Sequence, residues 1–296
     1  MKCSIQYILF VFVAVFLGCI KEVNVDSNFS KKLVITLRAS SNDKYNTFYA
    51  SGNFVLTEVI GGEPNLKNYY LQDLDFLLVD SKGNSTLVPT SNYLGYINDS
   101  SVFPFREGES YHVKVSAKDG RVAEGDLIFP KATKIDFCGF DTSASTYSTG
   151  LGIVKRDIDL SVKFNGSSFY NSVGARVYHS LHYITPSNTK KTESLISSFD
   201  FEDKPKQYFQ PVELNNKITI AHYNDSIVSF QIDIDSIVYY LHTEDDAYIH
   251  YLKTIQKQLA SSGDPFAEPT LIYSNVRGGL GIISGYSTSE KKIKFK

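Results

Sequence analysis

The sequence predicts a mainly β fold, with a β-sandwich in the N-terminal half and a second β-rich region that carries one amphipathic helix. Three observations support this prediction. The chain contains 20 Tyr and 20 Phe, and aromatic and β-branched residues suit a half-buried sheet. Several segments alternate apolar and polar residues with a period of two. Turn-forming residues separate these segments, which is typical of a sandwich.

Chain length and charge limit the possible functions. The 296 residues, 42% of them hydrophobic, suffice for one large core or two ordinary cores. The net charge of -2 results from 30 basic and 32 acidic residues, whereas nucleic-acid binding requires clustered Lys and Arg. We therefore expect no nucleic-acid partner. The sequence does not determine the oligomeric state.

Residues 1–18 are typical of a lipoprotein signal peptide. Ile8–Leu17 is an unbroken apolar run, too short for a membrane-spanning helix, which needs about 20 residues. The following Gly18-Cys19 completes a segment that resembles a lipobox, so we expect cleavage before Cys19 and lipid on that cysteine. Two or three acyl chains anchor a protein stably because each buried methylene contributes about 0.8 kcal/mol. The alternatives are an ordinary signal peptide with an incidental cysteine and an uncleaved membrane anchor.

Residues 19–30 are predicted to form a lipidated tether. Acidic residues near its cysteine resemble signals that direct some lipoproteins to the cell surface, which favours the surface over the periplasmic face. Because Cys3 should leave with the signal peptide and Cys19 should be acylated, Cys138 would be a free thiol. Its mostly apolar neighbours predict a buried small hydrophobe, and a reactive nucleophile is the alternative.

The N-terminal β-sandwich is predicted to cover residues 31–138. Strand candidates in its first half are Leu33–Leu37, Asn53–Ile60 and Tyr69–Val79. Asp80–Asn84 has the composition of a turn, in which Gly83 can adopt a positive φ.

A hairpin is expected later in this sandwich. Tyr111, Val113 and Val115 alternate with polar residues, so this strand should bury one face and expose the other. A turn at Lys118–Gly120 then leads to a returning strand at 122–129.

Residues 139–155 are rich in Ser, Thr and Gly, and they are predicted to form a linker or long loop. The C-terminal β-rich domain, 156–296, begins with the clearest alternating strand pattern, at Ile158, Leu160, Val162 and Phe164. Thr185–Asn216 is a polar excursion, predicted to be an insertion or exposed loop. Further strands are expected at Arg176–Ile184, Ile218–Ala221, Val228–Ile234 and Ile237–Leu241.

One helix is predicted at about 243–261. Thr243 can cap it, and the three acidic residues that follow suit the positive end of the helix dipole. The apolar stripe at helical spacing consists of Tyr248, Leu252, Ile255 and Leu259. Gly263 should end the helix, which should pack on a sheet through this stripe.

The sequence offers few candidates for chemistry. His242, Asp246 and His250 are spaced by four and could bind zinc on one helical face, but a solvated helix face explains them more simply. Asp233 and Asp235 share a strand face, where calcium is the alternative to a solvated surface.

Two further groups have structural explanations. His179 and His182 should face opposite sides of a strand and therefore not chelate one metal. The glycines Gly278, Gly279 and Gly281 predict tight turns and close backbone approach rather than a phosphate loop.

No local catalytic motif stands out, and no cofactor is expected. The chain has neither a Gly-x-Ser-x-Gly elbow nor a His-Glu-x-x-His motif. A hydrolase with a non-local site, such as paired carboxylates, stays open. Several tyrosines could stack on sugars, and the candidates are Tyr69, Tyr70, Tyr93, Tyr96, Tyr239 and Tyr240. The lack of Trp counts against a dedicated glycan platform, and sheet packing is the simpler explanation.

The C-terminal segments resemble a known family. Gly263–Pro269 (GDPFAEP), Tyr273–Val276 (YSNV) and Gly278–Ile283 (GGLGII) are similar to the ending of a Bacteroidota outer-membrane lipoprotein family described as domain of unknown function 4249. The strand that starts at Gly108–Tyr111 and its turn at Asp119-Gly120 also resemble the family's N-terminal part.

This resemblance implies an outer-membrane lipoprotein. It implies an N-terminal immunoglobulin- or transthyretin-like β-sandwich followed by a second β-rich domain. It also implies an accessory role beside a TonB-dependent transporter, and it carries over no functional residue.

Three functions therefore compete. We expect a non-enzymatic, membrane-anchored accessory or ligand-binding component of a TonB-dependent outer-membrane uptake system. Its expected partners are membrane lipid, through Cys19, and a TonB-dependent barrel. The alternatives are an independent surface adhesin or glycan-binding module and, third, a hydrolase with a non-local active site.

Overall fold

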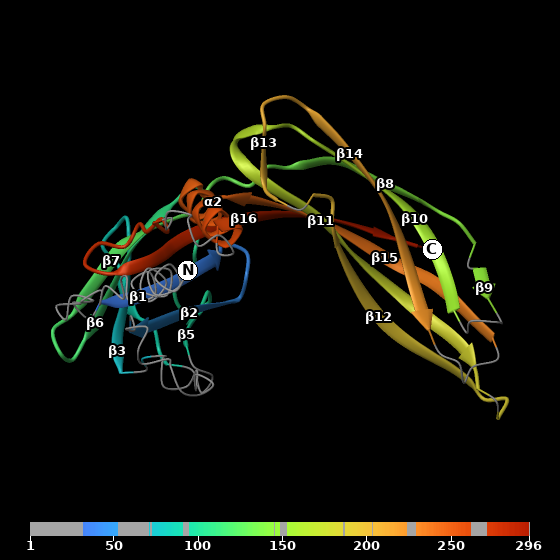
Figure 1. Cartoon of the computed structure of the whole chain (residues 1–296), viewed down its shortest axis with the longest axis horizontal. Helices are drawn as coiled ribbons and strands as arrows, with labels where there is room; N and C mark the ends of the chain where they lie inside the picture. The colour runs from blue at the N-terminus through green and yellow to red at the C-terminus, as the bar shows by residue number, and fades with distance from the viewer. Residues whose placement is uncertain are drawn as a thin grey trace, which may run out of the picture. The chain divides into compact units, whose positions relative to one another are not determined.

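The chain is mainly β, as the computed structural model in Figure 1 shows. The structure describes residues 32–52, 71, 73–90, 95–144, 146–148, 153–185, 187–202, 204–223, 229–261 and 271–295. All of these belong to one compact unit. The predicted signal peptide and tether, including Cys19, lie outside the described residues, as does the strand candidate Asn53–Ile60.

The largest sheet has eight strands in the order β12-β11-β15-β16-β1-β2-β5, and β13 also pairs with β11. These strands are β1 (Leu33–Ser40), β2 (Tyr45–Gly52), β5 (Tyr96–Asp99), β11 (Ser167–Ile184), β12 (Lys190–Asp200), β13 (Lys206–Tyr208), β15 (Ser229–Glu244) and β16 (Leu280–Lys294). The β1–β16 pair is parallel, and the other pairs in this sheet are antiparallel. We call it the large sheet.

Two smaller sheets complete the fold. One has the order β4-β3-β6-β7, and the other has the order β14-β10-β8 with β9 paired to β10. The first contains β3 (Leu74–Asp80), β4 (Ser85–Leu87), β6 (Ser110–Ala117) and β7 (Val122–Ile128). The second contains β8 (Ile135–Thr142), β9 (Thr146–Ser148), β10 (Ile153–Phe164) and β14 (Val212–Tyr223). The described helix is α2 (Asp246–Ser261).

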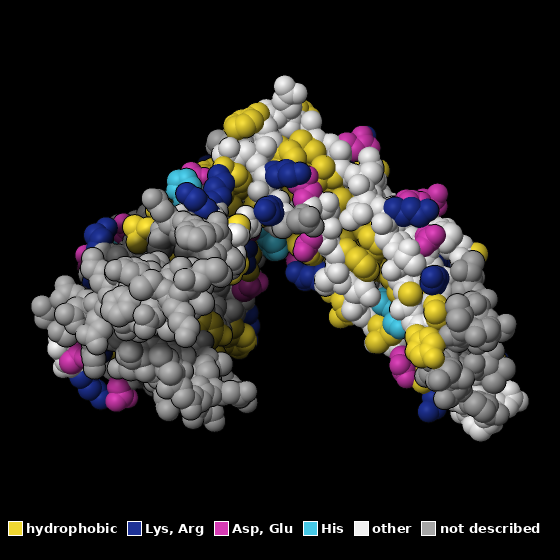
Figure 2. Space-filling view, viewed as in Figure 1, with side chains coloured by type: hydrophobic (Ala, Val, Ile, Leu, Met, Phe, Trp, Pro, Cys, Tyr) yellow, Lys and Arg dark blue, Asp and Glu magenta, His cyan; other side chains and the backbone are white. Residues whose placement is uncertain are grey.

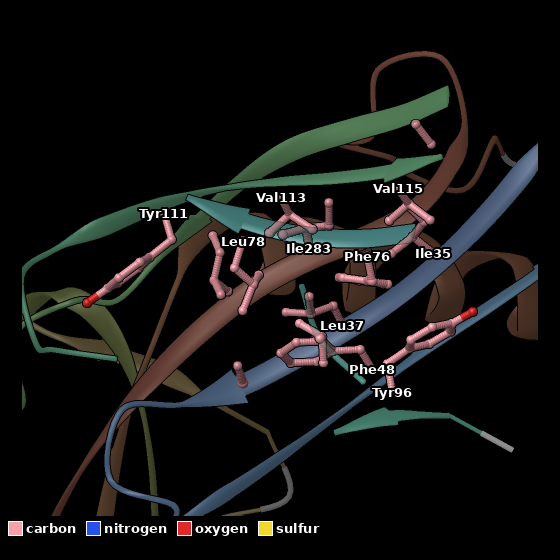
Figure 3. Packing of buried hydrophobic residues seen from close by; sticks show 14 of the residues in the cluster. Ile35, Leu37, Phe48, Phe76, Leu78, Tyr96, Tyr111, Val113, Val115 and Ile283 are labelled. Atoms are coloured by element: carbon pink, nitrogen blue, oxygen red, sulfur yellow. The ribbon is translucent and has the colours of Figure 1, made fainter. Parts of the chain in front are cut away.

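The first core is filled by alternate residues of strands from two sheets. In β1, Leu33, Ile35 and Leu37 are fully buried, and in β6 the buried positions include Val113 and Val115. Figure 3 shows side chains of β1 and β2 packed against side chains of β3 and β6. The predicted alternation and the hairpin at Lys118–Gly120 are confirmed. This cluster forms a β-sandwich core because each strand contributes one apolar face.

The second core lies between the large sheet and the β14-β10-β8 sheet. Ile158, Leu160, Val162 and Phe164 of β10 are all almost completely buried, which confirms the strand predicted from their alternation. They pack with Val173, Ala175 and Val177 of β11 and with Ile237, Tyr239 and Leu241 of β15.

Strand β16 contributes to both cores, which corrects the proposed division into domains at 31–138 and 156–296. Ile283 is buried in the first core, while Ile293 packs against the second. Val276, just before this strand, also belongs to the first core. The N-terminal sandwich is therefore completed by the C-terminal segment. Local sequence pattern cannot reveal this pairing, because the partners β1 and β16 are far apart in the chain.

The predicted linker at 139–155 is also wrong, because its described residues are mostly strand. It contains the end of β8, all of β9 and the start of β10. Ser and Thr side chains are compatible with an extended backbone, so their abundance did not exclude a sheet.

The polar excursion Thr185–Asn216 is likewise not a loop. It forms β12, β13 and the first part of β14. The first residues of β12, Lys190–Ser194, are all exposed. From Leu195 onward, half-buried residues alternate with exposed ones. A strand with this little buried area has a polar sequence, which explains why periodicity missed it.

The glycines near β16 have the predicted structural role. Gly278 and Gly281 have φ angles of 70° and 110°, a region that favours glycine. A Cβ added at Gly281 would lie 2.0 Å from the carbonyl oxygen of Ile35. The glycine therefore lets β16 approach β1 closely enough to pair with it.

Helix α2 begins three residues later than predicted. Thr243 and Glu244 are the last residues of β15, and Asp245 caps the helix by accepting a hydrogen bond from the Ala247 amide at 2.7 Å. Ile249 is its buried residue, while Leu259 of the predicted stripe is exposed. The acidic residue nearest the helix was the correct cap.

Candidate ligand-binding cleft

One face of the large sheet carries polar and aromatic side chains instead of a core. The register between β15 and β16 places Tyr240 opposite Glu290, His242 opposite Thr288 and Glu244 opposite Tyr286. Directly opposite residues share a sheet face. The intervening residues of β15 face the second core, so alternation along one strand separates the core from this polar face.

A cleft opens on this face. Its volume is 390 Å³, within the range of small-molecule sites, and its lining residues are Asn42, Asp43, Arg176, His242, Tyr286, Thr288 and Glu290. The Arg176 guanidinium lies 3.5 Å from the Glu290 carboxylate and 5.2 Å from the centre of the Tyr240 ring. The cleft therefore contains both charges, several hydroxyl and amide groups and aromatic surface.

Arg38 from β1 lies beside the cleft. Its guanidinium donates a 2.6 Å hydrogen bond to Glu244, and it stacks on the rings of Tyr248 and Tyr286 at 4.6 and 4.1 Å. Burial disfavours the charged form of Arg38 and by itself would lower its pKa. The nearby Glu244 carboxylate favours the charged form, and the pKa of Arg38 is raised overall. This cluster joins three strands of the large sheet to helix α2.

His242 is a neutral hydrogen-bonding group near pH 7. Burial is the main reason that its pKa falls to about 4, and the charges of Arg38 and Arg176 lower it further. Its Nδ1 lies 2.8 Å from the Thr288 hydroxyl. Its ring also contacts the ring of Tyr286 edge-on. The imidazole is thus held in one orientation by the sheet.

Three buried oxygen atoms near the start of α2 make no hydrogen bond to other described groups. They are Oε2 of Glu244, Oδ2 of Asp245 and Oγ of Ser284. Burial raises the pKa of both carboxyl groups, and that of Asp245 reaches about 6. This site is therefore electrostatically costly when both carboxyls are charged.

The structure does not bring together the three residues that were considered as the zinc alternative to a solvated helix face. His242 lies on β15, Asp246 is the exposed first residue of α2, and His250 is exposed beside the ring of Tyr273. Within the described residues, no three His, Cys, Asp or Glu side chains are arranged to hold a metal. A spacing of four residues places side chains on one face only within a continuous helix. Here β15 ends and α2 begins between His242 and Asp246, so the two residues do not share a helical face.

His179 and His182 face opposite sides of β11, as predicted. His179 is buried, with its Nε2 3.0 Å from Nε2 of His222 on β14. Burial lowers the pKa of both, so this pair is neutral near pH 7. His182 contacts Thr192 instead. No local pattern in the sequence points to His222, because its partner His179 lies on a strand of another sheet.

Asp233 and Asp235 do not form a calcium site with other described carboxylates. A register shift in the β11–β15 pairing falls beside Asp235, which accepts a hydrogen bond from Ser180. Asp233 contacts Arg156 and His182 at 3.5 and 3.3 Å. A basic neighbour on Asp233 favours the solvated-surface interpretation.

Cys138 is buried in the second core and is a free thiol, as predicted. Burial raises its pKa, which disfavours a reactive thiolate.

Among the tyrosines considered for sugar stacking, Tyr96 and Tyr239 are buried core residues and Tyr240 lies under Arg176. Tyr69, Tyr70 and Tyr93 lie outside the described residues.

A second hollow lies on the outer face of the β14-β10-β8 sheet. This groove has a volume of 710 Å³ and is lined by Phe137, Gly139, Phe140, Asp141, Asp159, Leu160, Ser161, Asn215, Asn216 and Lys217. Phe137 is 49% exposed. Figure 2 shows basic and acidic side chains lying among one another on the described part of the face in view. Both hollows are likewise lined by side chains of both charges, Arg176 with Asp43 and Glu290 in the cleft and Lys217 with Asp141 and Asp159 in the groove.

The fold and its cleft define a mainly β protein in which two cores share one large sheet. The chain belongs to the family described as domain of unknown function 4249 (DUF4249), whose model matches residues 22–292. No curated protein matches the chain significantly. None of the described helical segments is long and apolar enough to cross a membrane.

Proposed function

We propose that this protein is a lipid-anchored, non-enzymatic binding component of a TonB-dependent outer-membrane uptake system. The cleft beside Arg176 would hold a small polar ligand, and the rest of the surface would be available to the barrel. The observation that carries this proposal is the cleft itself: ionic, hydroxyl, amide and aromatic groups converge on it from one face of the large sheet and from the adjoining β1–β2 turn.

The electrostatics of the cleft favour binding over acid–base catalysis. His242 is neutral, and its Nδ1 is already engaged with Thr288. Arg176 and Glu290 lie within ion-pair distance. Side chains fixed by strands and by each other lose little freedom when a ligand binds.

Membrane attachment through Cys19 is the second part of the proposal. The apolar run Ile8–Leu17 and the lipobox-like segment support it, as does the resemblance to a Bacteroidota lipoprotein family. We place the protein on the outer membrane, with the cell surface favoured over the periplasmic face.

The anchor and the barrel partner are tested together. Wild-type chain with a C-terminal tag, expressed in its native host, should incorporate labelled palmitate and co-purify with a barrel in mild detergent. Cys19→Ser should abolish the label. Recovery without a barrel would contradict the uptake role, and an unlabelled wild type would contradict the anchor.

The cleft is tested with a matched pair of double variants. Native mass spectrometry of the purified protein should detect a bound polar small molecule in the wild type. Arg176→Gln/His242→Gln should lose it, whereas the control Arg121→Gln/His112→Gln, on the β6–β7 hairpin, should retain it. Equal retention by both variants would show that the cleft is not the binding site.

A glycan-binding module is the second candidate, and the outer groove favours it. An exposed aromatic ring at Phe137 lies beside carboxylate and amide groups, a combination suited to sugars. The Cys19→Ser chain would be applied to a glycan array, with Phe137→Ala as the groove variant. Signal that survives Phe137→Ala would exclude this groove.

A further inference from the structure

Strand β12 is the outermost strand of the large sheet, at the opposite end from β5 (Figure 1). Among the described residues it pairs only with β11. Two hydrogen bonds at the ends of the β11–β12 pair show which backbone groups of β12 point toward β11. The Phe201 amide donates to Val173, and the Thr185 amide donates to Thr189.

These bonds belong to the same ladder as the β11–β12 register, in which Gly174 is opposite Asp200. Directly opposite residues in an antiparallel pair exchange both bonds at every second position. Odd-numbered residues of β12 therefore bond to β11. Even-numbered residues direct their N–H and C=O groups outward, and the Asp200 carbonyl accordingly accepts a bond from the Asn216 side chain at 3.2 Å.

The middle of this edge lacks the features that usually protect an edge strand, which are confined to its ends: Lys190 and Lys191 lie at one end, and the Asn216 side chain occupies the outward carbonyl of Asp200 at the other. Its central residues, Ser194–Phe199, include no charge, proline or glycine. Ile196 is 61% exposed. Natural proteins usually place lysine, proline or a bulge on such an edge, because an unprotected edge pairs with another strand.

The sequence of β12 is complementary to itself in the antiparallel direction. Pairing two copies about Leu195 places Lys190 opposite Asp200, Thr192 opposite Ser198, and Ser194 opposite Ile196. All six residues direct their backbone groups outward, and on pairing the Asp200 carbonyl would exchange its hydrogen bond from Asn216 for one from the partner strand. The pairing therefore combines an ion pair at each end with hydroxyl pairs and a central contact between the two exposed Ile196 side chains.

We propose that a second copy of this chain binds along β12, through an antiparallel pairing whose two-fold axis passes through Leu195. The two large sheets then become one continuous sheet across the dimer. A closed two-fold interface uses the same surface on both subunits, and this one would do so. The proposal does not depend on the ligand in the cleft.

Cysteine cross-linking tests the register without disturbing the core. Full-length chains carrying Cys3→Ser, Cys19→Ser and Cys138→Ala would receive either Thr192→Cys or Ser198→Cys, both at exposed positions. Mild oxidation of a mixture should yield a cross-linked heterodimer, because opposite residues in such a pair lie about 5.5 Å apart, within disulfide reach. Each variant alone should remain largely uncross-linked.

Light scattering gives an independent result. The Cys19→Ser chain should elute with about twice the monomer mass at tens of micromolar, and Ser194→Lys/Ile196→Lys should return it to the monomer mass. A monomeric Cys19→Ser chain would overturn the proposal. So would efficient cross-linking of Thr192→Cys with itself, because that product requires a different register.

Discussion

The Arg38 guanidinium donates a 2.6 Å hydrogen bond to the Glu244 carboxylate, although 206 residues separate the two in the chain. Glu244 is almost completely buried, whereas the Arg38 side chain is 34% exposed. The pair links β1 to the end of β15 across β16. It therefore ties the first core to the second.

Removing the arginine should cost more than removing both partners. Arg38→Gln leaves a carboxylate buried without its counter-charge, and we expect a loss of about 2–3 kcal/mol, below the fully buried case because Arg38 is partly exposed. Glu244→Gln in the Arg38→Gln background should recover part of this loss. Urea unfolding monitors both changes. A double variant less stable than Arg38→Gln alone would show that the charge on Glu244 is not the cause.

Asp245 should make the folded state less stable as the pH rises. Its pKa is raised from 3.8 to about 6, chiefly by burial, so the folded protein holds the proton more tightly than the unfolded chain. The resulting stabilisation is complete below pH 3.8 and is lost as the pH approaches 6, at a cost of about 3 kcal/mol at most. Asp245→Asn keeps a side-chain oxygen to cap the helix but removes the loss of stability with rising pH, because an amide does not titrate. Urea midpoints at pH 4, 5 and 6 compare the variant with the wild type, and parallel curves would refute the assignment.

His242 should have the opposite effect. Its pKa is lowered from 6.5 to about 4, so the unfolded chain binds the proton more tightly. Stability from this residue is complete above pH 6.5 and is lost as the pH falls towards 4, again by about 3 kcal/mol at most. The wild type therefore gains stability from His242 as the pH rises from 4 to 6.5. In His242→Gln this gain is absent, so over the same rise in pH the stability should increase less, or decrease more steeply, than in the wild type. An unchanged pH dependence in the same urea series would count against a buried neutral imidazole.

Gly281→Ala should strongly destabilise the protein. The residue has a φ of 110°, and the new Cβ would lie 2.0 Å from the Ile35 carbonyl oxygen, so we expect a loss of about 3 kcal/mol or more. Gly120→Ala is the matched control, because Gly120 also has a positive φ but open space around it. It should lose only about 1–2 kcal/mol. Equal thermal shifts in the two variants would show that the contact with β1 is unimportant.

Native Cys138 should react slowly with alkylating reagents. The thiol is 7% exposed and its pKa is raised by burial, so we expect alkylation at pH 8 to be more than about tenfold slower than in urea. Mass spectrometry of the Cys3→Ser/Cys19→Ser chain, in which Cys138 is the remaining cysteine, measures both rates. Similar rates would instead support the alternative of an accessible, reactive thiol.

The candidate cleft was only partly predictable. His242 was selected from the sequence, but for zinc binding together with Asp246 and His250. Arg38, Arg176 and Tyr286 were not selected, because each is a single polar or aromatic residue on its own strand. Their shared face becomes apparent only when the register of β1, β11, β15 and β16 is known.

The sequence by itself determined the mainly β class, the alternating strands β6 and β10, the helix near 246–261 and the glycine turns before β16. Each of these follows from a pattern within about 15 residues, where side-chain periodicity and turn chemistry act locally. Only the tertiary structure decided that β16 pairs with β1, that residues 139–155 and 185–216 contain strands, and that the cleft forms. The physical reason is that strand pairing is made by backbone groups common to nearly every residue. Which strands meet therefore depends on how all apolar faces are buried together, and no single segment contains that information.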